Sequence, residues 1–204
     1  MRAIRPLRNL TRITRIVPRL ALAFVAAAAL LLADLAVAPT QAGAAGLDNT
    51  WACSVPAGYT YDQVQQTRQC SGGSSWTSTV FHLRTPADGV MSCTPVDGFV
   101  YDYVSLGSAC AQIGPQAASY RLRTAVDGMM ACTVKPGWTY DLISYGSACS
   151  QNAGVPSTTY RIKQPVNGLW ACFAPSGWTT TASMSTFDCS YTSGVPSTKY
   201  RLAG

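Results

Sequence analysis

The eight cysteines are the residues of this chain best placed to do chemistry. They fall into four pairs whose members lie 17 positions apart, and successive pairs begin 40, 39 and 40 positions apart. The pairs are Cys53/Cys70, Cys93/Cys110, Cys132/Cys149 and Cys172/Cys189. Zinc sites use closely spaced cysteines together with histidines, but this chain has no C-x-x-C and only one histidine. We therefore predict four disulfides, no metal site and no cofactor.

Two symmetric disulfide patterns fit this spacing. In the first, each pair closes its own loop, so that every repeated unit carries its own bridge. In the second, bridges join neighbouring units (Cys70–Cys93, Cys110–Cys132 and Cys149–Cys172), and Cys53–Cys189 closes a ring. We favour the first pattern because a duplicated unit that carries its own bridge can fold at every copy number.

Catalytic residues are hard to find in this sequence. A Ser-His-Asp triad would have to use His82, which occupies the strand position held by arginine in the other units and is expected to be an exposed strand residue. The chain has no glutamate, so a carboxylate pair would need aspartates. The three repeated aspartates are expected in turns or caps, and they are Asp62, Asp102 and Asp141. We expect no enzymatic activity.

Aromatic side chains are the remaining candidates for a binding site. One aromatic residue follows the conserved turn glycine in every unit, and a tyrosine lies two positions later in the first three units. These residues are Tyr59, Phe99, Trp138 and Trp178, followed by Tyr61, Tyr101 and Tyr140. Flat apolar rings beside Asp, Asn and Gln suit the faces and hydroxyls of sugars. The alternative is that these rings form the core of small β units.

The elements that position these residues recur with the cysteines. After residues 1–44, we divide the chain into repeat 1 (45–84), repeat 2 (85–123), repeat 3 (124–163) and repeat 4 (164–204). Each repeat opens with Asp-Asn, Asp-Gly or Asn-Gly and a short strand, continues through a Pro/Gly turn, and ends in a strand of alternating apolar and basic residues. No segment shows helical periodicity, so an all-β fold of four disulfide-stapled repeats is predicted.

The connection between repeats allows two architectures. The closing strand of one repeat leads through a short linker into the opening strand of the next, which predicts a β-hairpin across each boundary. If residues 200–202 then paired with residues 51–53, the array would close into a pseudo-four-fold ring or a small propeller. An open array is the competing architecture.

The first 44 residues have the pattern of a secretory signal peptide. Six arginines precede an apolar stretch at residues 20–33, and Ala42-Gly43-Ala44 resembles a signal-peptidase site. We predict cleavage after Ala44, with Ala42 as the alternative, and a secreted extracellular or periplasmic protein. The apolar stretch is shorter than the roughly 20 residues of a transmembrane helix, so no membrane anchor is expected after cleavage.

The charge of the chain lies mostly in this leader. The formal net charge is +6, but the leader holds six arginines and one aspartate, whereas the rest has nine Lys and Arg against eight Asp. A net charge of about +1 outside the leader provides no basic surface for the phosphates of a nucleic acid, so we expect no nucleic-acid binding.

Three functions remain open. The first is a secreted, non-catalytic repeat protein that binds a surface, glycan or protein partner through several sites. The second is a structural or envelope-associated protein without a dedicated ligand. The third is an inhibitor or toxin that uses the loops after the second cysteines, such as residues 71–79. The sequence identifies neither the ligand nor the oligomeric state.

Overall fold

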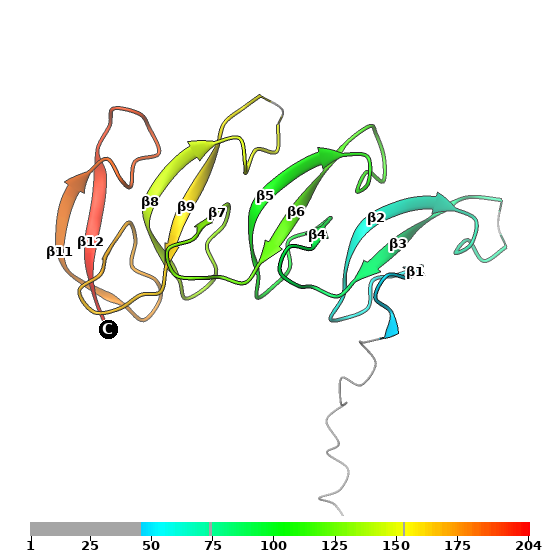
Figure 1. Cartoon of the computed structure of the whole chain (residues 1–204), viewed down its shortest axis with the longest axis horizontal. Coiled ribbons are helices and arrows are strands. Elements are labelled where there is room, and N and C mark those ends of the chain that lie inside the picture. The colour runs from blue at the N-terminus through cyan, green and yellow to red at the C-terminus, as the bar shows by residue number, and fades with distance from the viewer. Residues whose placement is uncertain (1–45, 74, 153) are drawn as a thin grey trace, which may run out of the picture. The chain divides into compact units, whose positions relative to one another are not determined.

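A computed structural model describes residues 46–73, 75–152 and 154–204, and the predicted signal peptide lies outside these residues. The described part of the chain contains twelve β-strands and no α-helix. No helix in the described ranges is long and apolar enough to cross a membrane. The strands form four separate three-stranded antiparallel sheets, one in each repeat (Figure 1). The predicted all-β repeat fold is therefore confirmed.

Each repeat contributes a short, a long and a closing strand. The short strands are β1 (Trp51–Ala52), β4 (Met91–Ser92), β7 (Met130–Ala131) and β10 (Trp170–Ala171). The long strands are β2 (Thr60–Thr67), β5 (Val100–Gly107), β8 (Thr139–Gly146) and β11 (Thr179–Thr186). The closing strands are β3 (Ser78–Arg84), β6 (Ala117–Arg123), β9 (Ser157–Lys163) and β12 (Ser197–Ala203).

The closing strand lies in the centre of every sheet, between the short and the long strand of the same repeat. Its alternation of apolar and basic residues buries one aliphatic side chain per repeat, and each of these is at most 1% exposed. These four residues are Leu83, Leu122, Ile162 and Leu202. The core is thus divided among the repeats, with one aliphatic centre in each sheet.

The predicted hairpin across each repeat boundary is wrong. Met91 of β4 pairs with Arg121 of β6 in its own repeat, and not with the preceding closing strand β3. The turn in the linker explains why the short strand pairs within its own repeat. Gly89, at φ 82°, donates its N–H to the carbonyl of Leu122, and the Asp88 carboxylate accepts the N–H of Thr124 at 2.6 Å. The start of each repeat is therefore tied to its own end.

Each long strand contains a β-bulge at its second or third residue. In β2 the register shifts between Tyr61 and Gln63, so Asp62 has no partner in the ladder, and β5, β8 and β11 shift at the equivalent place. A bulge bends the strand and redirects the side chain of the extra residue. The repeated aspartates occupy the bulge in the first three repeats.

All four disulfides close within a repeat, as the first of the two predicted patterns requires. The bridges are Cys53–Cys70, Cys93–Cys110, Cys132–Cys149 and Cys172–Cys189, with Cα–Cα distances of 5.3 to 5.5 Å. In the chain-entropy model a loop of this size contributes about 3 kcal/mol per bridge. Four disulfides in so small a domain are typical of extracellular proteins.

Neighbouring repeats are joined where each disulfide meets the preceding long strand. The Cys93 N–H donates to the carbonyl of Tyr61 at 2.8 Å, and the Val64 N–H donates to the carbonyl of Ala109, the residue before Cys110, at 2.8 Å. The same pair of bonds joins repeats 2 and 3 and repeats 3 and 4, at 2.7 to 2.8 Å. The repeats therefore form a continuous array although they share no sheet.

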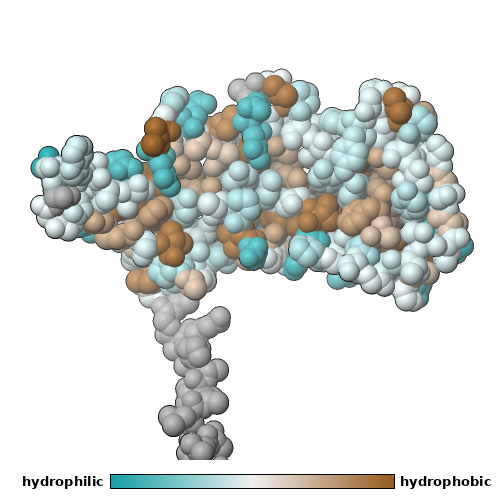
Figure 2. All heavy atoms as spheres, turned by 180° about the vertical axis from the view of Figure 1, so that it is seen from behind, coloured by the Kyte–Doolittle hydropathy of each residue, from teal (hydrophilic) through white to brown (hydrophobic). Residues whose placement is uncertain are grey.

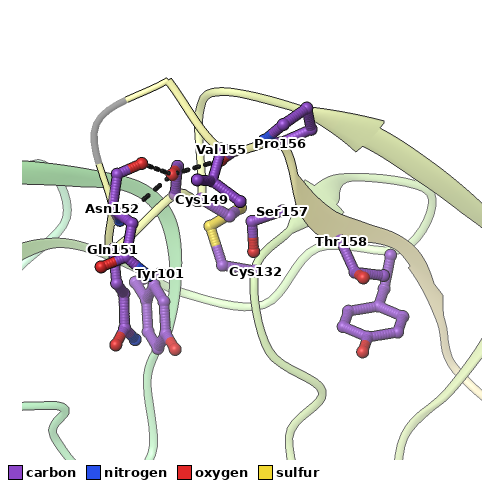
Figure 3. A pocket seen from close by; sticks show the side chains of 11 residues that line it. Tyr101, Cys132, Cys149, Gln151, Asn152, Val155, Pro156, Ser157 and Thr158 are labelled. Atoms are coloured by element: carbon purple, nitrogen blue, oxygen red, sulfur yellow. Dashed lines mark hydrogen bonds between the residues drawn. A yellow bond between two sulfur atoms is a disulfide. The ribbon is translucent and has the colours of Figure 1, made fainter.

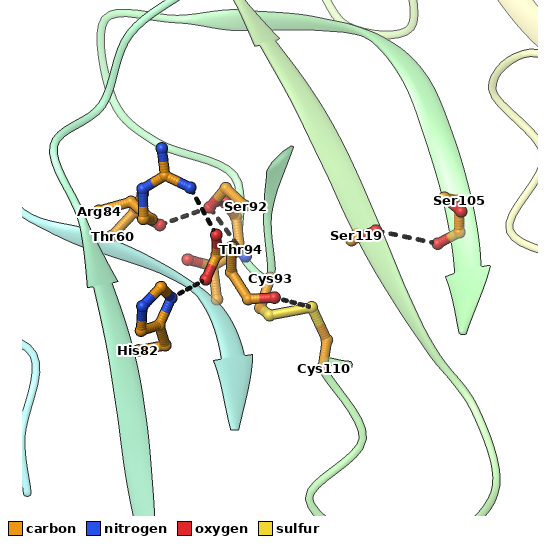
Figure 4. The surroundings of a disulfide bond; sticks show 10 residues. Thr60, His82, Arg84, Ser92, Cys93, Thr94, Ser105, Cys110 and Ser119 are labelled. Atoms are coloured by element: carbon orange, nitrogen blue, oxygen red, sulfur yellow. Dashed lines mark hydrogen bonds and ion pairs between the residues drawn. A yellow bond between two sulfur atoms is a disulfide. The ribbon is translucent and has the colours of Figure 1, made fainter. Parts of the chain in front are cut away.

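The side chains buried at the three junctions differ in polarity, and each buried hydroxyl has a partner. Between repeats 1 and 2 the hydroxyls of Thr60 and Ser92, 2% and 0% exposed, share a hydrogen bond (Figure 4). The equivalent positions between repeats 2 and 3 are Val100 and Ala131, both fully buried in one apolar cluster. Between repeats 3 and 4 they are Thr139 and Ala171, both 0% exposed, and the Thr139 hydroxyl donates to the carbonyl of Phe173 at 2.7 Å. The three junctions therefore leave none of these hydroxyls without a partner.

The array is open and does not close into a ring. The last closing strand, β12, already has β10 on one side and β11 on the other, so neither of its edges is free to pair with β1. The final long strand, β11, is exposed along seven of its eight residues. Its sequence also departs from that of the other long strands, and no described repeat covers it.

We predict that limited reduction opens Cys53–Cys70 first. Cys53 lies on the surface, whereas Cys110, Cys149 and Cys189 are only 8%, 4% and 2% exposed because they contact a preceding strand. Thiolate attack requires access to a sulfur atom. Partial reduction, alkylation and peptide mass spectrometry should label Cys53 and Cys70 several-fold faster than the other cysteines. Equal labelling of all four pairs would contradict the burial pattern.

We predict that Ser92→Ala costs the protein little stability, because it recreates the Thr139–Ala171 pair of the junction between repeats 3 and 4. There the buried Thr139 hydroxyl donates to the carbonyl of Phe173 at 2.7 Å, and Thr94 is the equivalent residue beside Thr60. The Thr60 hydroxyl should turn to the Thr94 carbonyl, so we expect a loss of about 1 kcal/mol or less, below the roughly 1–3 kcal/mol of a buried hydroxyl without a partner. Urea unfolding without reductant measures the loss, and a larger loss that Thr60→Val relieves would contradict this account.

Candidate binding edges

The repeated aspartates anchor ion pairs, which corrects their predicted role in turns or caps. The Asp102 carboxylate accepts hydrogen bonds from Arg121 at 2.7 Å and Arg123 at 3.0 Å. Asp141 binds Arg161 through two bonds, at 2.7 and 3.0 Å. Each carboxylate thus sits at a bulge and neutralises a cation of its own closing strand. This use of the aspartates favours structure over acid–base chemistry.

The pKa of Asp102 shows which effect dominates in this arrangement. Burial on its own would raise the pKa of the carboxyl, but the hydrogen bonds and charges of Arg121 and Arg123 outweigh burial and lower the pKa below its ordinary value. The Asp102 side chain is 16% exposed, whereas its two arginine partners are 40% and 38% exposed. Solvent therefore screens the pair, and its contribution to stability is small.

His82 is not the exposed strand residue that the sequence predicted. Its side chain is only 14% exposed, its Nδ1 lies 2.6 Å from Asp62 Oδ1, and its ring lies 5.0 Å from the ring of Trp51. Arg84 binds the second oxygen of the same carboxylate at 2.8 Å. His82 thus takes, beside the carboxylate of repeat 1, the place that arginine takes in repeats 2 and 3. In the described ranges, no group of three or more His, Cys, Asp or Glu could hold a metal ion.

The four aromatic residues after the turn glycine divide between surface grooves and packing. Tyr59 and Phe99 line a groove of about 400 Å³ between the Pro–Gly turns of repeats 1 and 2, and Phe99 also lines a groove of about 240 Å³ between repeats 2 and 3. Trp138 packs against the apolar cluster of Val100 and Ala131. Trp178 lies against the chain end at Gly204. We call this side of the array, where the Pro–Gly turns lie, the turn edge.

The three tyrosines two positions later pack against the closing strand. Ring centroids are 4.9 Å apart for Tyr61 and Phe81 and 4.8 Å apart for both Tyr101–Tyr120 and Tyr140–Tyr160. These pairs stabilise the sheets of the first three repeats. The partner rings were not predicted from the sequence, although an aromatic residue recurs at this position in all four closing strands. Of the three predicted tyrosines, only Tyr101 also lines the cavities described here.

The opposite ends of the long strands carry the loops that follow the second cysteines, and we call this side the loop edge. Its described residues are 71–73 and 75–77, 111–116, 150–152 and 154–156, and 190–196. None of these residues is Asp, Glu, Lys, Arg or His. The loop edge is therefore without formal charge.

Beneath the loop of repeat 3 lies a polar pocket of about 400 Å³. The disulfide Cys132–Cys149 and the side chains of Tyr101, Gln151 and Thr158 contribute to its lining (Figure 3). The loop above it is held by the Ser150 hydroxyl, which donates to the carbonyl of Val155 at 2.5 Å and accepts the Asn152 N–H at 3.2 Å. In repeat 4, Ser190 accepts the Thr192 N–H in the same way, at 3.1 Å. The two loops are thus fixed by the same internal bonds.

Every loop of this edge also presents a large apolar side chain to solvent. The exposed fractions are 79% for Trp76, 94% for Ile113, and 55% for both Val155 and Val195, and the loop of repeat 4 also exposes Tyr191, at 55%. In the space-filling view, hydrophobic residues stand out at the loops of repeats 2 to 4 and also along the opposite edge (Figure 2). This set could not be identified from the sequence, because a single apolar residue in a polar loop has no periodicity. The repeated Gly-Val-Pro-Ser-Thr of repeats 3 and 4 was the available signal.

We predict that Asp102→Asn destabilises the protein by about 1 kcal/mol at pH 7, because Arg121 and Arg123 lose the negative charge and one of the two oxygens that accept their hydrogen bonds. Since the folded-state pKa of Asp102 is lowered, its stabilisation is present above the ordinary pKa near 3.8 and is lost as the pH falls through the folded value. Urea unfolding at several pH values should show the variant and parent converging below about pH 4. A difference independent of pH would contradict this assignment.

Comparison of the chain with protein-family models, curated proteins and solved structures gives no match.

Proposed function

We propose that the protein is a non-catalytic binding module that attaches to an extracellular surface through its loop edge, with several repeats in contact at once. The observation that carries this proposal is that every loop exposes a large apolar side chain at its tip, namely Trp76, Ile113, Val155 and Val195, with Tyr191 as a second one in the loop of repeat 4. The described part of the chain is small, disulfide-stapled and repetitive, which is typical of extracellular proteins.

The chemistry of the loops favours contact with a partner. Isolated exposed apolar residues are ordinary, but an exposed apolar residue in the same loop of every repeat, along a single edge, is typical of an interaction surface. The absence of charge in these loops means that docking removes no ion from water, which would otherwise carry a large cost. Their serine, asparagine and glutamine groups can form hydrogen bonds around each apolar tip.

The loops are also preorganised. A disulfide lies at the base of each loop, and Ser150 and Ser190 bind backbone groups within the loops of repeats 3 and 4. A loop already held in one conformation loses less entropy when it binds. This rigidity supports recognition of a regular surface by fixed points of contact.

The strength of a single contact explains why several repeats are needed. Fully burying one Val or Ile side chain contributes about 1.5–3 kcal/mol, less than the roughly 4 kcal/mol of a millimolar interaction. Contacts linked in one chain gain effective concentration and raise the overall affinity by orders of magnitude. The partner is therefore expected to display repeated sites, as cell-envelope polysaccharides and densely covered cell surfaces do.

Binding to whole cells, isolated cell-envelope polysaccharide and a glycan array tests this function. We expect the parent to bind at least one of them, each single change of a loop tip to serine to weaken binding several-fold, and the quadruple variant to lose binding. Val126→Ser and Val166→Ser are matched controls, because these linker valines are 60% and 56% exposed but lie outside the loop edge.

Three outcomes would reject this proposal. Full binding by the folded quadruple variant would exclude the loop edge, and equal loss in the linker controls would show that general surface apolarity is responsible. Failure of the parent to bind any surface would favour the structural, ligand-free alternative. Turnover of a substrate by the purified protein would contradict a non-catalytic role.

The grooves of the turn edge favour a second candidate, which is carbohydrate binding between the Pro–Gly turns. Phe99 lines both grooves beside Asp97, a combination of ring and carboxylate that suits stacking and hydrogen bonding to a sugar. In the same assays, Phe99→Ala would abolish binding if this edge were used and would leave it intact if the loop edge were used.

A further inference from the structure

We propose that the disulfide face of repeat 1, formed by Ala52, Cys53 and Cys70, is a docking site for the exposed edge strand of another protein. The strand would carry the sequence Tyr-Asp-x-Val or Tyr-Asp-x-Ile. This inference does not rest on the function proposed for the loop edge, because it concerns the end of the array.

The structure contains three internal examples of this docking. At each junction, the N–H of a first cysteine donates to the carbonyl of a tyrosine on the preceding long strand. In return, the N–H of a valine or isoleucine three positions later donates to the carbonyl of the residue before a second cysteine. The docking strands contain Tyr61-Asp62-Gln63-Val64, Tyr101-Asp102-Tyr103-Val104 and Tyr140-Asp141-Leu142-Ile143.

The same face of repeat 1 is not covered by a repeat. Ser92, Ala131 and Ala171 precede the first cysteine of repeats 2, 3 and 4, and all three are 0% exposed. Their counterpart Ala52 is only half-buried, and Cys53 is exposed. The free face is thus a continuation of an interface that forms three times within the chain.

The other end of the array is unsuited to be the partner. In β11 the tyrosine and aspartate are replaced by Thr180 and Thr181, and the valine or isoleucine by Ser183, and all three residues are exposed. Terminal repeats of such arrays typically have a polar outer face. In a second copy of the chain, the three docking sequences are already docked on its own repeats and the exposed strand β11 lacks it, so the partner must be a different chain that presents it.

Restoring the docking sequence in β11 tests the site in the full chain. We expect the triple variant Thr180→Tyr, Thr181→Asp, Ser183→Ile to associate head to tail as its concentration rises, because β11 then matches β8 at the positions that dock. Sedimentation velocity measures the association. Adding Ala52→Glu should abolish it, since the glutamate places a charge on the proposed face, and intact disulfides and an unchanged circular dichroism spectrum confirm folding of each variant.

A peptide provides a second measurement on the unmodified face. The peptide of residues 139–146 should slow the reduction of Cys53–Cys70 in the parent several-fold, whereas the peptide of residues 179–186 serves as the control and should have no effect. Two results would overturn the proposal. One is a folded triple variant that does not associate at high micromolar concentration, and the other is association or protection that survives Ala52→Glu.

Discussion

Each disulfide in repeats 2 to 4 is held against the long strand of the repeat before it by two backbone hydrogen bonds, such as Cys93 N–H to Tyr61 and Val64 N–H to Ala109. The bridge therefore has two functions, since it closes its own loop and also presents two fixed backbone groups to a neighbour. A repeat of about 40 residues has too small a core to be stable alone. The junctions bury Thr60 with Ser92 and Val100 with Ala131, so the core of the array lies as much between the repeats as within them.

This nearest-neighbour arrangement explains the differences between the repeats. The long strands of the first three repeats carry Tyr, Asp and Val or Ile because a further repeat covers them, whereas β11 carries Thr180, Thr181 and Ser183 because it faces solvent. The aspartate at the bulge of the first three repeats pairs with cations of the closing strand. The bulge itself does not depend on this pair, since β11 shifts register at the same place with Thr181. The exposed loop tips take no part in the junctions between repeats. We therefore assign binding to them.

The period of the cysteines was enough to predict the repeats, and the frequent turn residues without helical periodicity predicted the all-β fold. The spacing fitted two disulfide patterns, and the pattern within each repeat was preferred because a unit with its own bridge can fold at every copy number. The strand with which each short strand pairs could not be predicted. A strand of two residues is too short to show an alternation of apolar and polar side chains, and an Asp-Gly turn does not specify the pairing partner of the strand after it. In the sequence, the open end is marked by Thr180 and Thr181, which replace the tyrosine and aspartate of the other long strands. The reason for this replacement is seen only in the structure, where the strand is exposed. The aromatic residues after the turn glycine have different environments, since Phe99 lines grooves whereas Trp138 packs into a cluster. This difference depends on tertiary contacts and could not be predicted from their shared position in the repeat.

Amide hydrogen exchange of the first cysteine in each repeat tests the docking of disulfides on preceding strands most directly. NMR on the folded, oxidised protein would follow the N–H groups of Cys53, Cys93, Cys132 and Cys172 under one set of conditions. The account predicts slow exchange for the last three, whose N–H groups donate to Tyr61, Tyr101 and Tyr140, and fast exchange for Cys53, which no preceding repeat covers. Exchange at Cys93, Cys132 and Cys172 as fast as at Cys53 would contradict it.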